Sequence, residues 1–299
     1  KNLKILNFFY NFQNKSNLNF IGYFKSKKLI AILGLIDQRN WDKKIGKDYF
    51  ISIMCKSKKY HKDVTFKLIS FVIKKLSPNM ISCLGFNKEI FTIFKNIGYC
   101  TKMNHHYILN DKIKSNVSKN LKKNLAKKND DIKFKITYSL DYLEKIKSFP
   151  IKSLKYFNNK YSNNPFYNYF FINFIYKRKV LFFFVARKIF INKFKSSVIR
   201  LVDFYGYNTK KYYIADKFLK ILYNEQSEYL DFLSFGIDKK TLNSMGFNEK
   251  KNNQLIPNYF EPYLPSNKKL DLCILYSKNK IKDLLIFKGD GDQERPNII

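Results

Sequence analysis

Arginine is scarce in this sequence: it supplies only five of the 57 basic residues, and lysine supplies the rest. Lysine is enriched together with asparagine, isoleucine, phenylalanine and tyrosine, which is the composition that an AT-rich genome produces. Proteins that read nucleic acids concentrate charge on one face and favour the planar fork of arginine. Because lysine is spread along the whole chain, the formal charge of +34 predicts a solvated surface and does not favour a nucleic-acid partner.

Cysteine and histidine are also rare, with four and three residues. The cysteines show no C-x-x-C spacing and no neighbouring histidine pair, which argues against a zinc site and against a disulfide framework. We expect four buried thiols in a reducing compartment, the cytoplasm, and no metal. These cysteines are Cys55, Cys83, Cys100 and Cys273.

Long hydrophobic runs are missing as well. The longest, 169–176 and 180–186, are separated by three basic residues and fall short of the roughly 20 residues that span a bilayer. We therefore expect no membrane span. Hydrophobic residues nevertheless make up 45% of the chain, which is enough for a large core.

Glycine occurs only ten times, yet two glycines and three acidic residues fall together between Gly289 and Glu294. They belong to the C-terminal stretch FKGDGDQERPNII, residues 287–299. We interpret it as a turn in which an acidic side chain pairs with Arg295. A calcium loop is not favoured, because such a loop needs further ligands and a late glutamate.

The first part of the chain alternates strand and helix patterns. Strands are predicted at 19–24, 28–36, 48–57, 80–86 and 99–109, and helices at 62–76 and 87–100. In the longer helix, Val64, Leu68 and Val72 recur at a spacing of four, and Ser77-Pro78 ends it. Residues 113–133, rich in lysine and asparagine, predict a linker with some helical character.

The second part repeats this order. Its predicted strands are 169–176, 180–191, 197–206 and 228–236, and its predicted helices are 142–149, 209–224 and 238–247. Both parts end in a short helix followed by glycine and an aromatic residue, Gly98-Tyr99 and Gly246-Phe247. The repetition predicts a duplicated α/β (α+β) unit, with domains at 1–112 and 134–299.

This order resembles the GNAT (acyl-CoA N-acyltransferase) fold, present twice in tandem. Each domain would have a mixed, mostly antiparallel central sheet flanked by helices. The second domain is also similar to family members from surface-polysaccharide biosynthesis, in 160–169, 198–206, 229–237, 256–263 and 288–297. By this resemblance the acidic C-terminal turn is a family signature. The chain starts with Lys1, and we expect the first domain to be incomplete at its N-terminus.

The resemblance implies an acyl-CoA donor, with acetyl-CoA favoured, whose pyrophosphate binds at the N-terminus of the helix after the long strand. In the first domain Tyr60, Asp63 and Thr65 replace the family's basic or amide and small residues, and the Asp63 carboxylate would repel pyrophosphate. That donor site is therefore expected to be degenerate. In the second domain the donor-binding residues would be Gly206, Tyr207, Asn208, Thr209 and Lys210.

N-acylation needs a base for the amine and an acid for the departing thiolate. His105 and His106 are candidates because histidine titrates near neutrality, although neighbours on a strand face opposite sides. Asp203 is the third catalytic candidate. Asp203 and Arg200 lie in an apolar stretch, where an unpaired charge is costly, and Asp231 is a partner for one of them. A buried structural ion pair and a contact with substrate explain these charges equally well.

The candidates for binding the acceptor are Tyr161, Asn164, Arg200, Asp231, Asp290, Asp292 and Arg295. The resulting hypothesis is an acyl-CoA-dependent N-acyltransferase that modifies an amino sugar or similar amine for a surface polysaccharide, with its acceptor between the domains. The second interpretation is a tandem transferase with an aminoacyl-tRNA donor, which would explain the positive charge of the chain. The third interpretation is a non-catalytic basic binding protein whose donor loops have decayed.

Overall fold

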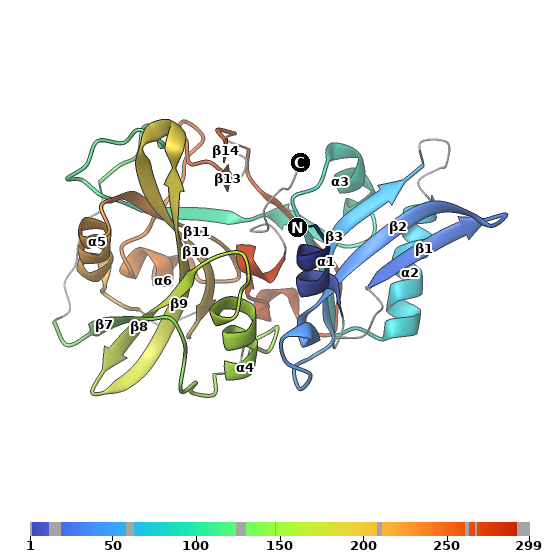
Figure 1. The fold of residues 1–299 in the computed structure, drawn as a ribbon, viewed down its shortest axis with the longest axis horizontal. Helices are drawn as coiled ribbons and strands as arrows, with labels where there is room; N and C mark the ends of the chain where they lie inside the picture. Colours follow the sequence, from blue (N-terminus) through green and yellow to red (C-terminus); the bar gives the residue numbers. More distant parts are fainter. Residues whose placement is uncertain are drawn as a thin grey trace.

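The computed structural model describes residues 2–11, 19–57, 63–123, 130–146, 148–207, 211–260, 263–266 and 268–291. Two sheets lie side by side, the first in blue and cyan and the second mostly in green and gold, with the red C-terminal segment between them (Figure 1). Each sheet is mixed and mostly antiparallel and is flanked by helices. The predicted fold class is therefore confirmed.

The first sheet has the strand order β1-β2-β3-β4-β15-β5. Its strands are β1 (Phe20–Lys25), β2 (Lys28–Asp37), β3 (Asp48–Lys56), β4 (Met80–Leu84), β15 (Asp271–Ser277) and β5 (Tyr99–Lys102). Its helices are α1 (Asn2–Tyr10), α2 (Asp63–Leu76) and α3 (Lys88–Lys95). Val64, Leu68 and Val72 are all buried in α2, as the spacing predicted. The Asn87 side chain caps α3 by accepting the N–H of Ile90.

The second sheet has the order β7-β8-β9-β10-β11-β6-β12, and β16 pairs with one end of β11. Its strands are β7 (Lys133–Thr137), β8 (Tyr169–Tyr176), β9 (Lys179–Ile191), β10 (Ser196–Tyr205), β11 (Ser227–Phe235), β6 (Asn104–Leu109), β12 (Asn248–Glu249) and β16 (Ile286–Phe287). Helices α5 (Ala215–Asn224) and α6 (Lys239–Ser244) lie on one side, and α4 (Leu154–Phe157) lies on the side of the first sheet (Figure 1).

The remaining elements are short. They are the helical turns η2 (Gln38–Asn40), η3 (Asn158–Ser162), η4 (Asn192–Phe194), η5 (Ile281–Asp283) and η6 (Lys288–Asp290), and the hairpin of β13 (Tyr259–Phe260) and β14 (Tyr263–Leu264). The turn η3 continues α4 without a break. Together α4 and η3 carry three of the polar side chains described below.

Each sheet contains one strand from the other half of the chain. β15, from the C-terminal part, lies between β4 and β5, whereas β6, from the N-terminal part, lies between β11 and β12. Both sheets therefore follow one plan, and among the described strands only β3–β4 and β10–β11 pair in parallel. The domain boundaries at 1–112, 113–133 and 134–299 stay a prediction. Each sheet contains one strand from beyond these boundaries, β15 in the first sheet and β6 in the second.

Three predicted elements differ from the structure. The strand expected at 99–109 is divided at Met103, because β5 joins the first sheet and β6 the second. The helix expected at 142–149 is wrong: its described residues are irregular, and long-range contacts hold them, such as the Leu285 N–H bonded to the Phe149 carbonyl (2.7 Å). The helix expected at 209–224 begins only at Ala215. The described part of the linker contains no helix.

One hydrophobic core joins the two sheets. Alternate residues of β8 face opposite sides. Phe170 and Ile172 pack in a cluster with α5, whereas Tyr169 and Phe171 belong to an inner cluster that also contains Trp41 from the first half. Because both halves contribute to this inner cluster, polar groups enclosed within it are largely removed from water.

The prediction of four buried thiols is wrong for three of the four cysteines. Cys100 and Cys273 form a disulfide, with their Cα atoms 4.1 Å apart. They lie directly opposite each other on β5 and β15, which the strand exchange makes neighbours. Cys83 is buried, as expected, but Cys55 is exposed.

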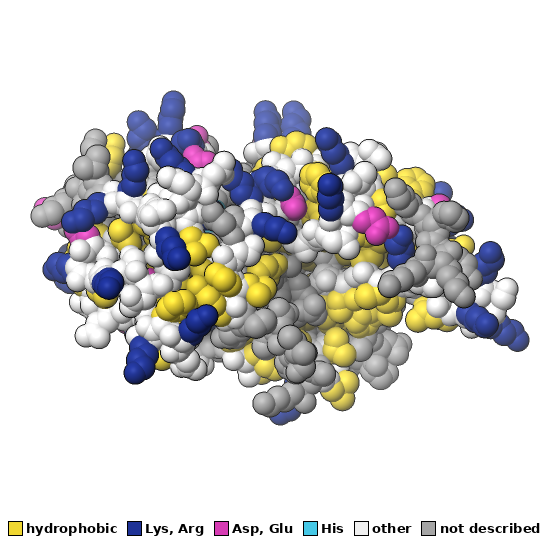
Figure 2. Space-filling model, turned by 90° about the horizontal axis from the view of Figure 1, so that it is seen from above, with side chains coloured by type: hydrophobic (Ala, Val, Ile, Leu, Met, Phe, Trp, Pro, Cys, Tyr) yellow, Lys and Arg dark blue, Asp and Glu magenta, His cyan; other side chains and the backbone are white. Residues whose placement is uncertain are grey.

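The charge distribution agrees with the lysine pattern of the sequence. On the face shown in Figure 2, basic side chains are scattered over both halves rather than gathered in one patch. No helix among the described residues is long and apolar enough to cross a membrane.

Candidate active site

A cavity of about 780 Å³ opens beside α4. Its wall is formed by residues from 141–154, which include the segment 142–149 that was predicted as a helix, together with Tyr205 at the end of β10. The Tyr205 hydroxyl fixes this wall, because it accepts the N–H of Ile146 (2.9 Å) and donates to the Glu144 carbonyl (2.8 Å). The irregular segment is thus bonded to the second sheet at two of its backbone groups, the Glu144 carbonyl and the Ile146 N–H.

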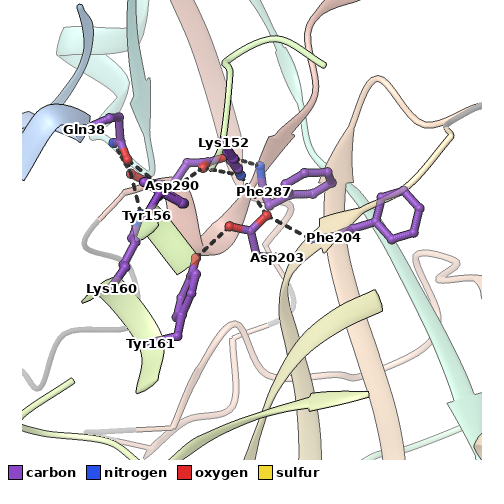
Figure 3. A network of polar contacts seen from close by, with 9 residues as sticks. All are labelled: Gln38, Lys152, Tyr156, Lys160, Tyr161, Asp203, Phe204, Phe287 and Asp290. Carbon is purple, nitrogen blue, oxygen red and sulfur yellow. Dashed lines mark hydrogen bonds and ion pairs between the residues drawn. The ribbon is translucent and has the colours of Figure 1, made fainter. Parts of the chain in front are cut away.

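Lys152 lines this cavity although the residue is only 7% exposed. Its Nζ lies 2.7 Å from Asp203 Oδ1 and 2.6 Å from Asp290 Oδ1 (Figure 3). Burial lowers the pKa of Lys152, but the two carboxylates outweigh it, and the pKa stays above its ordinary value. Lys152 therefore remains a charged ammonium at neutral pH.

Asp203 lies on β10 where that strand changes register against β9, between Leu201 and Asp203. It is fully buried and accepts hydrogen bonds from the Tyr161 hydroxyl (2.7 Å) and from the Phe204 N–H (2.8 Å). Burial raises the pKa of the Asp203 carboxyl, and the ammonium of Lys152 opposes this. Two predicted site residues, Asp203 and Tyr161, are thus brought together.

The C-terminal segment supplies Asp290. The parallel pairing of β10 with β11 ends at Leu201 and Phe232, and beyond that point β16 pairs with β11 instead. Gly289 then packs so closely that a Cβ there would lie 2.7 Å from the Val202 carbonyl oxygen. The glycine-rich acidic turn is therefore fitted between two parting strands, and this places the Asp290 carboxylate against Lys152.

A second layer of polar groups lies behind these carboxylates (Figure 3). Lys160 donates to the Tyr156 hydroxyl (2.7 Å), which donates to Gln38 Oε1 (3.0 Å), and Gln38 Nε2 donates to the Asp290 carbonyl (2.8 Å). Burial lowers the pKa of Lys160 to about 7, and its ammonium lies 4.5 Å from the Trp41 ring centre. This layer joins α4 and η3 to the first half of the chain.

Sequence reasoning missed Lys152, Tyr156, Lys160 and Gln38. Both lysines are deeply buried, but nothing in their spacing distinguishes them from the many exposed lysines of this chain. The one usable signal is that Lys152 stands among apolar residues in the stretch 149–154, FPIKSL. A charge in such surroundings needs a partner.

The predicted catalytic histidines lie elsewhere, and neither lines the cavity. His105 Nε2 is 2.7 Å from Asp231 Oδ2, and Asp231 also accepts two hydrogen bonds from Arg200 (3.0 and 2.7 Å). The expectation that Asp231 pairs with a charge on the neighbouring strand is confirmed for Arg200. Burial lowers the pKa of His105, although the hydrogen bond that its ring donates to Asp231 opposes this.

The Arg200 guanidinium is further bonded to the carbonyl groups of Pro257 and Asn258, both at 2.7 Å. This set of contacts is that of a buried structural ion pair, fully engaged by protein groups. His106 faces the other side of β6 and packs against Phe247, and burial lowers its pKa to about 4. Its catalytic role, like that of His105, stays a prediction.

The remaining predicted residues are dispersed. Asn164 shapes a turn, since its Oδ1 accepts the N–H groups of Phe166 and Tyr167, both at 3.0 Å. Gly206 packs against the side chains of Phe182 and Phe204. Asn208, Thr209, Lys210, Asp292 and Arg295 lie outside the described residues.

Only Gly206 and Tyr207 of the predicted donor loop lie among the described residues. Tyr207 is 39% exposed, and α5 has Ile214 at its N-cap, which offers no side-chain hydrogen bond. Among the described residues, no three His, Cys, Asp or Glu side chains are grouped to hold a metal ion.

No family model matches the sequence, and no curated protein is significantly similar to it. The chain is similar to a GCN5-related N-acetyltransferase from Anabaena variabilis, with 10% identity and a TM-score of 0.48 over 87% of this chain and 63% of that protein. It is similar to a GNAT-family acetyltransferase from Colwellia psychrerythraea, with 8% identity and a TM-score of 0.35 over 85% and 84% of the two chains.

A third similar structure is Eis1 from Mycobacterium abscessus, with 9% identity and a TM-score of 0.43 over 78% of this chain and 62% of that protein. The chain thus spans less than two thirds of the length of the Anabaena and Mycobacterium proteins. With TM-scores of 0.48 or less, these likenesses assign neither a family nor an activity to the chain.

Proposed function

We propose that this chain transfers an acyl group from an acyl-CoA-type thioester to a small amine, with the reaction beside Lys152. The observation that carries the proposal is that Lys152, a residue of the cavity wall, has a buried ammonium held by two carboxylates, Asp203 and Asp290. Acyl transfer develops negative charge on the carbonyl oxygen and on the departing thiolate. A fixed cation in surroundings poor in water stabilises such charge far more than it would in bulk water.

Lys152 has a proton available for this role. The hydrogen bonds of the described residues engage two of its three N–H groups, one with Asp203 and one with Asp290. The third N–H group would donate to the carbonyl oxygen of the acyl group. Asp203 and Asp290 do not line the cavity, so they are positioning residues that hold the ammonium and keep it charged.

Two further carboxylates suit an amine acceptor. Asp141 and Glu144 lie at the exposed side of the cavity, on a chain whose surface is otherwise dominated by lysine. They would attract a protonated amine and accept a proton from it before it attacks. The acceptor class implied by the sequence resemblance is an amino sugar for a surface polysaccharide, and acetyl-CoA is the simplest donor.

The test is a transfer assay with acetyl-CoA or octanoyl-CoA as the donor and a panel of amino sugars and polyamines as acceptors, with the acylated product detected by mass spectrometry. Lys152→Met should lower the rate by about 100-fold or more, because removing one oxyanion partner costs this much. Lys145→Met is the matched control, since Lys145 lines the same cavity from the exposed side. Equal rates for Lys152→Met and the wild type would overturn the proposal.

A second function, a non-catalytic binding protein, is favoured by one observation. The chain's own segment of β16 and η6 lies between β10 and β11 where their pairing ends. The resemblance places the donor after the long strand β10, and this segment of the chain packs against that strand. Absence of product with every donor, together with no thermal stabilisation by CoA, would favour this second function.

A further inference from the structure

The cavity beside Lys152 has an apolar wall. Leu143, Ile146, Phe149 and Leu154 line it and pack with their other sides against the inner core. Lys152 is the buried charge of the lining, whereas Asp141 and Glu144 are exposed. A ligand that enters therefore meets hydrocarbon along most of its length and a cation at the buried end.

Two large side chains at the cavity are unusually exposed. Tyr142 is 70% exposed and Ile151 is 53% exposed, although both flank an apolar wall. Exposed apolar area of this kind costs free energy in water and is regained when a ligand covers it. Their exposure favours a ligand with an apolar part that covers them.

The size of the cavity points the same way. About 780 Å³ falls within the range of pockets that enclose whole organic ligands. An acetyl group would fill only a small part of it and would leave the wall formed by Leu143 and Ile146 in contact with water.

We propose that the cavity holds an acyl chain of medium length, near eight carbons, with its carbonyl oxygen hydrogen-bonded to Lys152 and its hydrocarbon tail along Leu143, Ile146 and Phe149. This inference rests on the proposed acyl transfer and names its donor class: medium-chain acyl thioesters rather than acetyl thioesters. The carbonyl oxygen takes the third N–H group of Lys152. The tail takes the place of water along the apolar wall.

The first experiment measures kcat/KM for acetyl-, butyryl-, octanoyl- and palmitoyl-CoA with one acceptor. Octanoyl-CoA should exceed acetyl-CoA by about tenfold or more, since added methylene groups in an apolar pocket give gains of this order. Ile146→Trp fills the cavity and should lower kcat/KM for octanoyl-CoA about tenfold more than it lowers kcat/KM for acetyl-CoA, so that the preference is lost. Leu143→Trp serves the same purpose if the first variant fails to fold.

Leu264→Trp is the matched control, because Leu264 is 45% exposed and does not line the cavity. It should keep the preference for octanoyl-CoA. Equal kcat/KM for acetyl-CoA and octanoyl-CoA in the wild type would overturn the inference and leave the proposed function intact.

A second measurement distinguishes failure of this inference from failure of the proposed acyl transfer. Sodium octanoate and sodium acetate are titrated into the wild type and Ile146→Trp by calorimetry, with no donor or acceptor present. Binding of octanoate by the wild type alone supports the inference even where no transfer occurs, in which case only the proposed function fails. Absence of octanoate binding together with absence of a chain-length preference overturns the inference.

Discussion

Lys152 Nζ lies 2.6 Å from the Asp290 carboxylate, and this ion pair joins the wall of the cavity to the C-terminal segment. Asp203, on β10, holds the same ammonium from the sheet. Three distant parts of the chain therefore meet at one charge. A buried ammonium with two carboxylates is stable only as a group, because removing one member leaves an uncompensated charge in the core.

Lys152→Met is expected to destabilise the protein strongly. It leaves Asp203 and Asp290 buried without their cation, and a broken buried pair costs about 3–5 kcal/mol of unfolding free energy. The triple variant Lys152→Met, Asp203→Asn, Asp290→Asn should recover most of this loss, because it removes the charges as well. Urea unfolding at pH 7.5 measures both. A loss below about 1 kcal/mol for the single variant would show that the carboxylates are not charged.

His106→Phe should make the protein less sensitive to acid. Burial lowers the pKa of His106 to about 4, whereas an unfolded histidine titrates near 6.5. Between these values the unfolded chain binds more protons, so the unfolding free energy falls as the pH falls from about 6.5 to about 4. The advantage of His106→Phe over the wild type should therefore be larger near pH 4.5 than at pH 7.5. An equal advantage at both pH values would contradict this.

Lys160→Met should change the pH dependence of the unfolding free energy at alkaline pH, whereas His106→Phe changes it at acidic pH. Burial lowers the pKa of Lys160 to about 7, while an unfolded lysine titrates near 10.4. Between these values the unfolded chain again binds more protons, so the unfolding free energy of the wild type rises from about pH 7 to about pH 10. The stability of Lys160→Met relative to the wild type should fall over this range. A flat difference between Lys160→Met and the wild type across this range would contradict the lowered pKa of Lys160.

The strands and helices were largely predictable because their signals are local. The hairpin of β1 and β2 and the amphipathic helix α2 follow from residue spacing within a short stretch, and tertiary contacts did not alter them. The segment 142–149 shows the opposite case. Its helical pattern gave way to long-range bonds with Tyr205 and Leu285, which no local pattern records.

The strand exchange and the site were beyond local reasoning. A single residue, Met103, separates β5 from β6, so the sequence reads as one strand although the two belong to different sheets. Asp203 was found from its apolar surroundings, but its partner Lys152 looks like any other lysine until the fold buries it. Pairing across the chain, rather than residue type, defines this site.

The disulfide between Cys100 and Cys273 should hold the exchanged strand β15 in the first sheet. The two cysteines are 173 residues apart, and a link that closes so long a loop restricts the unfolded chain strongly. Reduction, or the double variant Cys100→Ala, Cys273→Ala, is therefore expected to cost about 3–5 kcal/mol of unfolding free energy. Cys55→Ala is the control, because Cys55 is a free and exposed cysteine on β3, and it should leave the response to reductant unchanged.

Two measurements test this link. Urea unfolding with and without dithiothreitol should give separated midpoints for the wild type and a single midpoint for the double variant. Hydrogen exchange should show faster opening of 271–277 in the double variant, since β15 is then held only by its pairing with β4 and β5. If the wild type unfolds at the same urea concentration under both conditions, all four cysteines are thiols, as the sequence first indicated, and the exchanged strand is held by packing alone.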